Sequence, residues 1–113
     1  MADTIKVLGQ SNPAAATDTD IYVVPSNTST VVSSIVICET AGGTPTFDVA
    51  VRPKGIVIST EHYLFNARPL TANQTVVLTA GITLAAGDTI TVQASDTNVA
   101  FSVFGVETTR EER

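Results

Sequence analysis

Between residues 21 and 107, apolar side chains alternate with serine, threonine or small residues along almost the whole chain. Successive side chains of a β-strand point to opposite faces, so this alternation is typical of strands with one buried face. Turn signals recur about every ten residues, which is the spacing of a sandwich or barrel, and no helix-length amphipathic stretch interrupts them. The pattern therefore predicts an all-β protein.

The pattern predicts seven strands, at residues 21–24, 30–39, 46–52, 62–67, 75–79, 89–95 and 99–106. Residues 4–8 are either a first short strand or an arm, and residues 11–19 are expected to be a loop. We therefore expect a single antiparallel β-sandwich of jelly-roll type, with seven to eight strands, over residues 20–107. Residues 1–19 form the arm or first strand with its loop, and residues 108–113 form a charged tail.

The alternation also assigns the buried faces of three strands. The expected inward side chains are Phe47, Val49 and Val51, then Ile90, Val92 and Ala94, and finally Val99, Phe101 and Val103. The last strand loses its alternation at Gly105, which predicts a β-bulge or bend there. Ala41, Gly42 and Gly43 are expected to join two strands as a hairpin.

Residues 31–38 differ, because they carry apolar side chains on both faces, with Ser33 and Ser34 between them. Two explanations are open. The segment is either a central strand with small exposed valines, or a strand whose outer face packs against another subunit.

Composition limits the function. The chain has 113 residues, which is enough for one domain, and its formal net charge of −5 argues against a nucleic-acid-binding surface. No apolar run is long enough to cross a bilayer, and the first ten residues lack the pattern of a signal peptide, so we expect a protein made and used without Sec export. No cofactor is predicted.

The reactive residues are few. One cysteine, Cys38, excludes an intramolecular disulfide, and one histidine, His62, excludes an all-histidine metal cage. His62 next to Glu61 suggests acid–base chemistry, but adjacent residues of a strand point to opposite faces, so we interpret His62 as a surface or interface residue. Cys38 lies in the most apolar strand and is expected to behave as a small hydrophobic side chain. No catalytic residue is predicted.

Three features of the sequence suggest a metal, a glycan attachment or a sugar ligand, and none of them carries a site. Asp18 and Asp20 offer oxygen ligands for calcium, but the loop lacks the remaining ligands, so no metal site is predicted. Asn27 and Asn73 begin glycosylation sequons and are interpreted as turn residues. A carbohydrate-binding module needs exposed aromatic platforms, and this chain has no tryptophan. Its aromatic residues are Tyr22, Phe47, Tyr63, Phe65, Phe101 and Phe104.

Four segments, with HYLF at residues 62–65 between them, carry a resemblance to a known family. They are IYVVP at residues 21–25, VVSSIVIC at 31–38, FDVAVR at 47–52 and FSVFGVE at 101–107. Together the chain resembles small β-sandwich virion structural proteins of tailed bacteriophages, over about residues 21–107. These motifs concern packing and turns, so they bear on fold and virion context.

The resemblance implies a non-enzymatic protein of the phage particle, a capsid cement or decoration protein that stabilises the head by binding across junctions between capsid subunits. The implied partners are the major capsid protein or other virion proteins, with the chain itself forming a homotrimer. Its place would be the capsid surface of a virion assembled in the host cytoplasm. A neck, baseplate or fibre-attachment protein of the tail is one alternative, and a carbohydrate-binding module is the other. The expected interface residues are Ile5, Val7, Leu8, Val32, Val36 and His62, the first three as an arm that adds to a neighbouring sheet.

Overall fold

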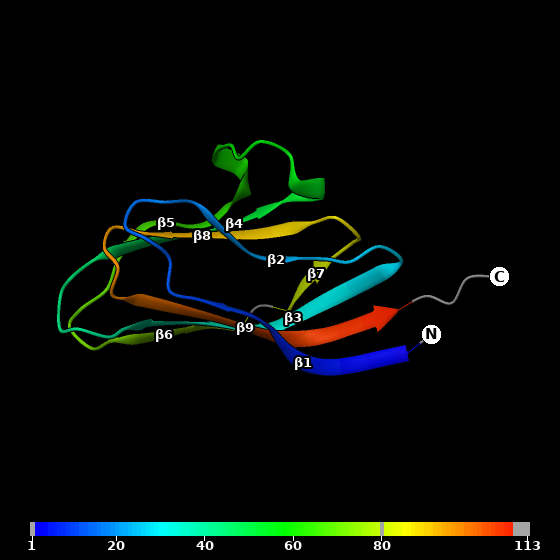
Figure 1. Cartoon of the computed structure of the whole chain (residues 1–113), viewed down its shortest axis with the longest axis horizontal. Helices are drawn as coiled ribbons and strands as arrows, with labels where there is room; N and C mark the ends of the chain where they lie inside the picture. Colours follow the sequence, from blue (N-terminus) through cyan, green and yellow to red (C-terminus); the bar gives the residue numbers. More distant parts are fainter. Residues whose placement is uncertain (1, 80, 110–113) are drawn as a thin grey trace.

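The computed structural model describes residues 2–79 and 81–109, which form nine strands in two antiparallel sheets packed face to face (Figure 1). Sheet A contains, in spatial order, β1 (Ala2–Ser11), β9 (Val99–Thr109), β3 (Thr28–Glu39) and β6 (Thr75–Leu78), and β7 (Ile82–Leu84) also pairs with β3. Sheet B contains β2 (Thr19–Val23), β8 (Thr89–Ala94), β4 (Thr46–Arg52) and β5 (Tyr63–Pro69). Two short 3-10 turns, η1 (Pro53–Gly55) and η2 (Thr60–His62), connect β4 to β5.

This strand order confirms the predicted jelly roll. β6 and β7 pair with successive segments of β3, so together they take the place of one strand, and the arrangement is that of an eight-stranded jelly roll. All seven predicted strands are present, and their ends either coincide with the predicted ones or differ by up to three residues. The extra strand β7 was not predicted.

The core lies between the sheets and is built by the predicted inward side chains. Phe47, Val49, Ile90, Val92, Ala94, Val99, Phe101 and Val103 are buried, and Val51 is half-buried at the edge of this group. The Phe47 ring lies edge-on to Phe101, with ring centroids 6.3 Å apart, and edge-on to Phe65, at 5.3 Å. Aromatic contacts of this kind add to the free energy gained by burial.

Residues 2–11 are the first strand of the sandwich, so of the two alternatives for this segment the structure has the strand. β1 pairs with β9 over its whole length, from Ala2 opposite Thr109 to Ser11 opposite Phe101. The described ends of the chain therefore lie side by side at one end of sheet A (Figure 1). Thr108 and Thr109 of the predicted tail belong to β9, and residues 1 and 110–113 lie outside the described residues.

A pair of β-bulges lies at one level of sheet A. Leu8 is an extra residue of β1, and Ser33 is an extra residue of β3, both beside Phe104 of β9. The bulge expected at Gly105 is thus found on both neighbours of β9 instead. Gly105 itself is needed for close approach, because a Cβ at this position would collide with the carbonyl oxygen of Val31.

The expected hairpin at residues 41–43 is wrong, because β3 and β4 belong to different sheets. The buried Glu39 carboxylate holds the crossing: it accepts backbone N–H bonds from Ala41 (3.1 Å), Gly42 (2.7 Å) and Gly43 (3.1 Å). It also accepts the N–H of Asn73 at 2.9 Å. The bond from Asn73, followed by those of the other three amides, lowers the Glu39 pKa and so favours the ionised carboxylate.

Candidate interaction surfaces

The outer face of sheet A carries apolar side chains aligned across three strands. Ile5 of β1 lies opposite Val106 of β9, which in turn lies opposite Val31 of β3. In the next row on this face, Val7 lies opposite Phe104. Ile5 is 85% exposed and Val7 and Val31 are each 47% exposed, so water covers much of these rows in the isolated chain.

The same apolar surface continues toward the other edge of sheet A. Val36 of β3 lies opposite Val77 of β6, which is 58% exposed. Small hydroxyl side chains lie within these rows: Ser34 is opposite Phe104, and Ser102 is opposite Val36. Among the described residues of these strands, Asp3 is the one charged side chain that the register places on this face. Low charge together with exposed apolar groups is typical of the centre of a protein interface.

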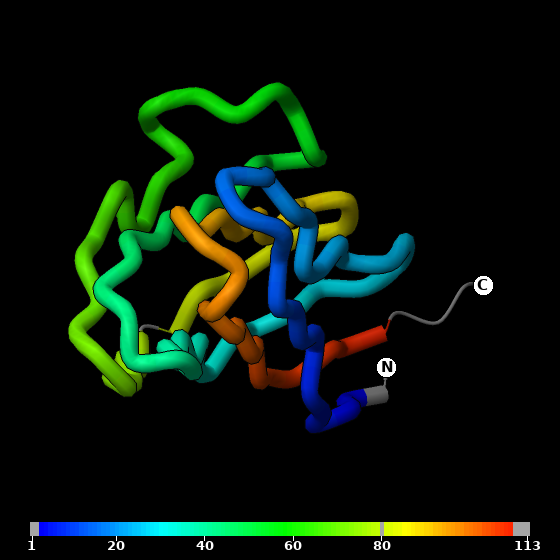
Figure 2. The backbone as a smooth tube through the Cα atoms, turned by 60° about the vertical axis from the view of Figure 1, so that its left-hand side comes forward, coloured from blue at the N-terminus to red at the C-terminus, as the bar shows by residue number. Residues whose placement is uncertain are grey.

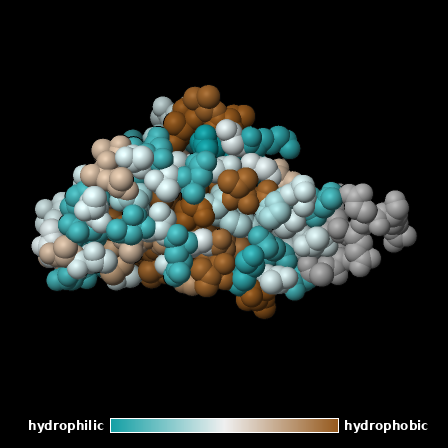
Figure 3. All heavy atoms as spheres, in the orientation of Figure 1, coloured by the Kyte–Doolittle hydropathy of each residue, from teal (hydrophilic) through white to brown (hydrophobic). Residues whose placement is uncertain are grey.

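A second apolar surface lies on the opposite side of the sandwich. The loop of residues 53–62 stands out from sheet B, above β4 and β8 in Figure 1 and well separated from β1 and β9 in Figure 2. Its Ile56 and Val57 are 53% and 85% exposed, and apolar residues gather at this projection in Figure 3. We call residues 53–62 the projecting loop.

The base of the projecting loop is fixed to sheet B by Arg52. The Arg52 guanidinium donates hydrogen bonds to the carbonyl oxygens of Gly55 (3.3 Å) and Ile56 (3.1 Å). The same group binds the Asp20 carboxylate at 2.9 Å and the Thr91 hydroxyl at 3.0 Å. These bonds hold the apolar tip on a rigid support.

His62 closes the other end of the projecting loop. It is buried, and its Nδ1 accepts the N–H of Ser59 at 3.0 Å. Glu61 accepts a hydrogen bond from the Ser59 hydroxyl, which lowers the Glu61 pKa. Both side chains therefore bond to Ser59 in a capping arrangement and do not form an acid–base pair with each other.

The structure divides the six predicted interface residues equally. Three lie on the outer face of sheet A, namely Ile5, Val7 and Val36, and three are buried, namely Leu8, Val32 and His62. The buried three contact the interior of their own chain, so we correct their assignment to an interface.

The bulge at Ser33 explains the correction for β3. With unbroken alternation, Val32 and Val36 would lie on the same face, since they are four residues apart. The extra residue turns Val32 toward the core and leaves Val36 on the outer face. Sequence reasoning also missed Ile56 and Val57, although an apolar run directly after a turn and outside any expected strand is the signal that marks them.

The acidic and asparagine residues singled out in the sequence have structural partners. Asp20 accepts bonds from Arg52 and from the Thr91 hydroxyl, the latter at 2.9 Å, and Asp18 accepts one from Gln93 at 2.8 Å. Within residues 2–79 and 81–109, no group of three or more His, Cys, Asp or Glu side chains is placed to hold a metal ion. Asn27 and Asn73 both have positive φ angles, as their interpretation as turn residues requires.

The buried Tyr22 hydroxyl joins the two sheets. It donates to the Glu107 carboxylate at 2.6 Å and lies 2.8 Å from the Thr30 hydroxyl, while Lys6 pairs with the other Glu107 oxygen at 3.3 Å. Burial, and then the bond to Glu107, raise the Tyr22 pKa to about 12. Tyr22 therefore stays protonated and serves as a structural link.

The remaining aromatic residues and the cysteine offer little to a ligand. Tyr63, Phe65 and Phe104 are half-buried and the other aromatic side chains are buried, so none forms an exposed platform for a sugar ring. Arg68 also covers Phe65, with its guanidinium carbon 5.0 Å from the ring centroid. Cys38 is half-buried and directs its thiol to the carbonyl oxygen of Glu39 at 3.7 Å.

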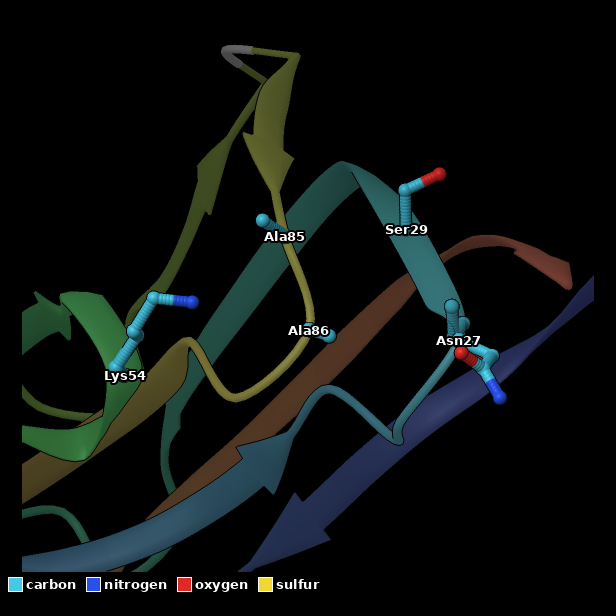
Figure 4. Close-up of a pocket in the computed structure, with 6 residues that line it drawn as sticks. Asn27, Ser29, Lys54, Ala85 and Ala86 are labelled. Atoms are coloured by element: carbon cyan, nitrogen blue, oxygen red, sulfur yellow. The ribbon is translucent and has the colours of Figure 1, made fainter. Parts of the chain in front are cut away.

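A shallow hollow of about 360 Å³ lies between the turn before β3, η1 and the turn after β7 (Figure 4). Asn27 and Ser29 line one side, Ala85 and Ala86 another, and Lys54 a third. One ammonium group with small neighbours gives no set of convergent groups that fixes a ligand. The two apolar surfaces are thus the stronger candidates for function.

Among the described residues, no helix has the length and apolar character that crossing a bilayer requires. No protein-family model matches the chain, and no curated protein matches it. Among solved structures, the chain is similar to a pentameric capsid protein isolated from metagenomic phage sequences, with 22% sequence identity and a TM-score of 0.38. The match covers 91% of this chain and 61% of that protein, so this chain spans less than two thirds of its length.

Proposed function

We propose that this chain is a non-enzymatic structural subunit of a tailed-bacteriophage virion that cements or decorates the capsid. The observation that carries the proposal is the pair of apolar surfaces on opposite sides of one rigid sandwich. A protein that bridges other subunits needs at least two contact surfaces that do not overlap. The sequence resemblance to small virion proteins supplies the class of particle.

In this proposal the projecting loop binds the junction between subunits of the major capsid protein. Ile56 and Val57 would enter an apolar depression there, and burying each side chain contributes about 1.5–3 kcal/mol before the cost of association. Several copies held together multiply such modest contacts, because the second loop binds at a high effective concentration. A homo-oligomer, the trimer expected from the resemblance, suits this function.

The tail is the alternative location. A neck, baseplate or fibre-attachment protein also needs two contact surfaces, and the two locations differ in the number of copies per particle. A cement protein on the capsid surface is present in about one copy per capsid subunit, or one trimer per local threefold axis. A tail component is present in far fewer copies.

Quantitative mass spectrometry of purified virions, scaled to the major capsid protein, tests this proposal. A ratio near one supports the cement function, a ratio far below one assigns the chain to the tail, and absence of the chain from virions refutes both.

Binding of purified chain to capsids that lack it tests the projecting loop. We expect Val57→Lys to weaken binding by about 100-fold, since it places a charge where an apolar contact is needed. Val23→Lys is the matched control, because Val23 is 51% exposed and lies on β2, outside the projecting loop and outside sheet A. Equal binding by the two variants would remove the loop from the proposal.

A further inference from the structure

The outer face of sheet A fits another copy of this chain better than it fits a charged partner. The chain has a formal net charge of −5, so two copies repel each other unless they meet through a neutral surface. This face is such a surface, with Asp3 as its one charged side chain among the described residues of the sheet. Asp3 also accepts a hydrogen bond from Thr108 at 2.8 Å and lies at one end of the face.

The dimensions of the face suit a stable contact between subunits. β1 has 10 residues, β9 has 11 and β3 has 12, and at about 3.3 Å per residue the strands are about 33 Å long. Four strand positions at about 4.8 Å make the face about 19 Å wide, so its flat area is roughly 600 Å². Because side chains project from this plane, the solvent-accessible area is larger than the flat area and comes close to the roughly 800 Å² per partner of a standard interface.

The chemistry of the face is self-complementary. Its apolar rows also contain hydroxyl groups: Ile5, Val31 and Val106 form one row, Ser34 lies beside Phe104 in the next, and Ser102 lies beside Val36 in a third. Two such faces pack with apolar groups between them, while the hydroxyls accept and donate hydrogen bonds without the cost of burying a charge.

We propose that copies of this chain associate through the outer face of sheet A, which leaves the projecting loop of each copy free on the far side. This inference rests on the proposed function, since it assigns the self-association that a cement oligomer needs to one of the two surfaces. Direct stacking of two faces gives an isologous dimer, and packing of the face on another part of the next copy gives a closed ring such as a trimer.

Sedimentation equilibrium of the purified full chain tests the proposal, with Val31→Lys as the test variant. Val31 lies in the same apolar row as Ile5 and Val106 and is 47% exposed, so the variant places an ammonium group in the contact without disturbing the core. We expect an oligomeric wild-type chain and a dissociation constant raised by about 100-fold in the variant. Val23→Lys, at a 51% exposed valine on β2 of sheet B, is the control and should leave self-association unchanged.

A second variant on the same face tests whether a loss of self-association comes from the surface or from misfolding of one variant. Val77→Lys lies on the same face, on β6 rather than β3, and its side chain is 58% exposed. Both variants should keep the wild-type circular dichroism spectrum while losing self-association. A wild-type chain that stays monomeric at high concentration overturns the inference, and so do variants of the face that associate as the wild type does.

These results are separable from the test of function. A monomeric chain that is nevertheless abundant in virions refutes the self-association and leaves the cement function standing. A chain that associates through this face but is absent from virions refutes the cement function and leaves the self-association standing.

Discussion

Replacing Phe101 by alanine tests how the sandwich is held together. Phe101 is 1% exposed, lies near the start of β9 and packs edge-on against Phe47 from the other sheet. The substitution removes the aromatic group and leaves a cavity whose walls come from both sheets. We expect the two sheets to lose a large part of their contact energy.

The size of the loss follows from burial. An aromatic side chain buries at least about 150 Å², which at about 25 cal/mol per Å² is about 4 kcal/mol. This value lies within the range of about 3–5 kcal/mol for such truncations in protein cores. For 113 residues the entropy of unfolding is about 0.24 kcal/mol per degree, so Tm should fall by about 17 °C.

Thermal unfolding followed by circular dichroism measures this shift, and Phe104→Ala is the matched control. Phe104 lies three residues further along β9, on the outer face of sheet A, and is half-buried. At concentrations where the chain is monomeric, its truncation should cost about 1 kcal/mol and lower Tm by about 4 °C. Equal shifts for the two variants, or a larger one for Phe104→Ala, would refute the assignment of the two faces.

Three further predictions concern the strand ends, the crossing and the bulges. Deleting residues 1–10 removes Leu8 from the core and uncovers the edge of β9, so the cooperative thermal transition should be lost; a wild-type Tm would make the segment an arm. Glu39→Gln should lower Tm at neutral pH, because an amide cannot accept all four N–H bonds. Folding lowers the Glu39 pKa, so the ionised carboxylate contributes its full stability above the pKa of the unfolded chain, about 4.3, and this contribution is lost as pH falls through the pKa of the folded chain. The difference in Tm between wild type and Glu39→Gln should therefore become smaller in melts recorded at decreasing pH. Gly105→Ala should cost about 1–3 kcal/mol in urea unfolding, because the new methyl group collides with the Val31 carbonyl, and an unchanged midpoint would contradict the close approach.

The jelly roll and its core could be predicted because they depend on alternation within single strands. Phe47 and Ile90 lie in strands whose pattern is unbroken, and Phe101 lies in the part of the last strand that precedes Gly105, so alternation placed all three correctly. The crossing after Glu39 could not be predicted in this way. Two glycines after a strand fit a hairpin as well as they fit a crossing to the other sheet. In the structure the buried Glu39 carboxylate binds the amides of this turn, and the chain crosses to the other sheet.

The apolar outer face was predicted only in part, because it depends on the register between strands. Ile5 and Val106 are 101 positions apart in the sequence, and they become neighbours only through the pairing of β1 with β9. The sequence marks Val31 as part of a strand with apolar side chains on both faces, but the bulge decides which residues of that strand share a face with it. The exposed tip at Val57 belongs to a loop with no periodicity, so alternation carries no information about it.

The doubled serine at positions 33 and 34 acts as a phase shift in β3. Upstream of it the even-numbered side chains enter the core, and downstream the odd-numbered ones do, so Val32 and Ile35 are both interior. Removing one of the two serines would leave Val32 and Ile35 two positions apart, so simple alternation would keep both in the core. If the strand kept both serines without the bulge, Ile35 and Ile37 would face water while Val36 entered the core, and half of the longest strand would be inside out. The bulge therefore lets β3 carry one extra residue without exchanging the faces of its second half.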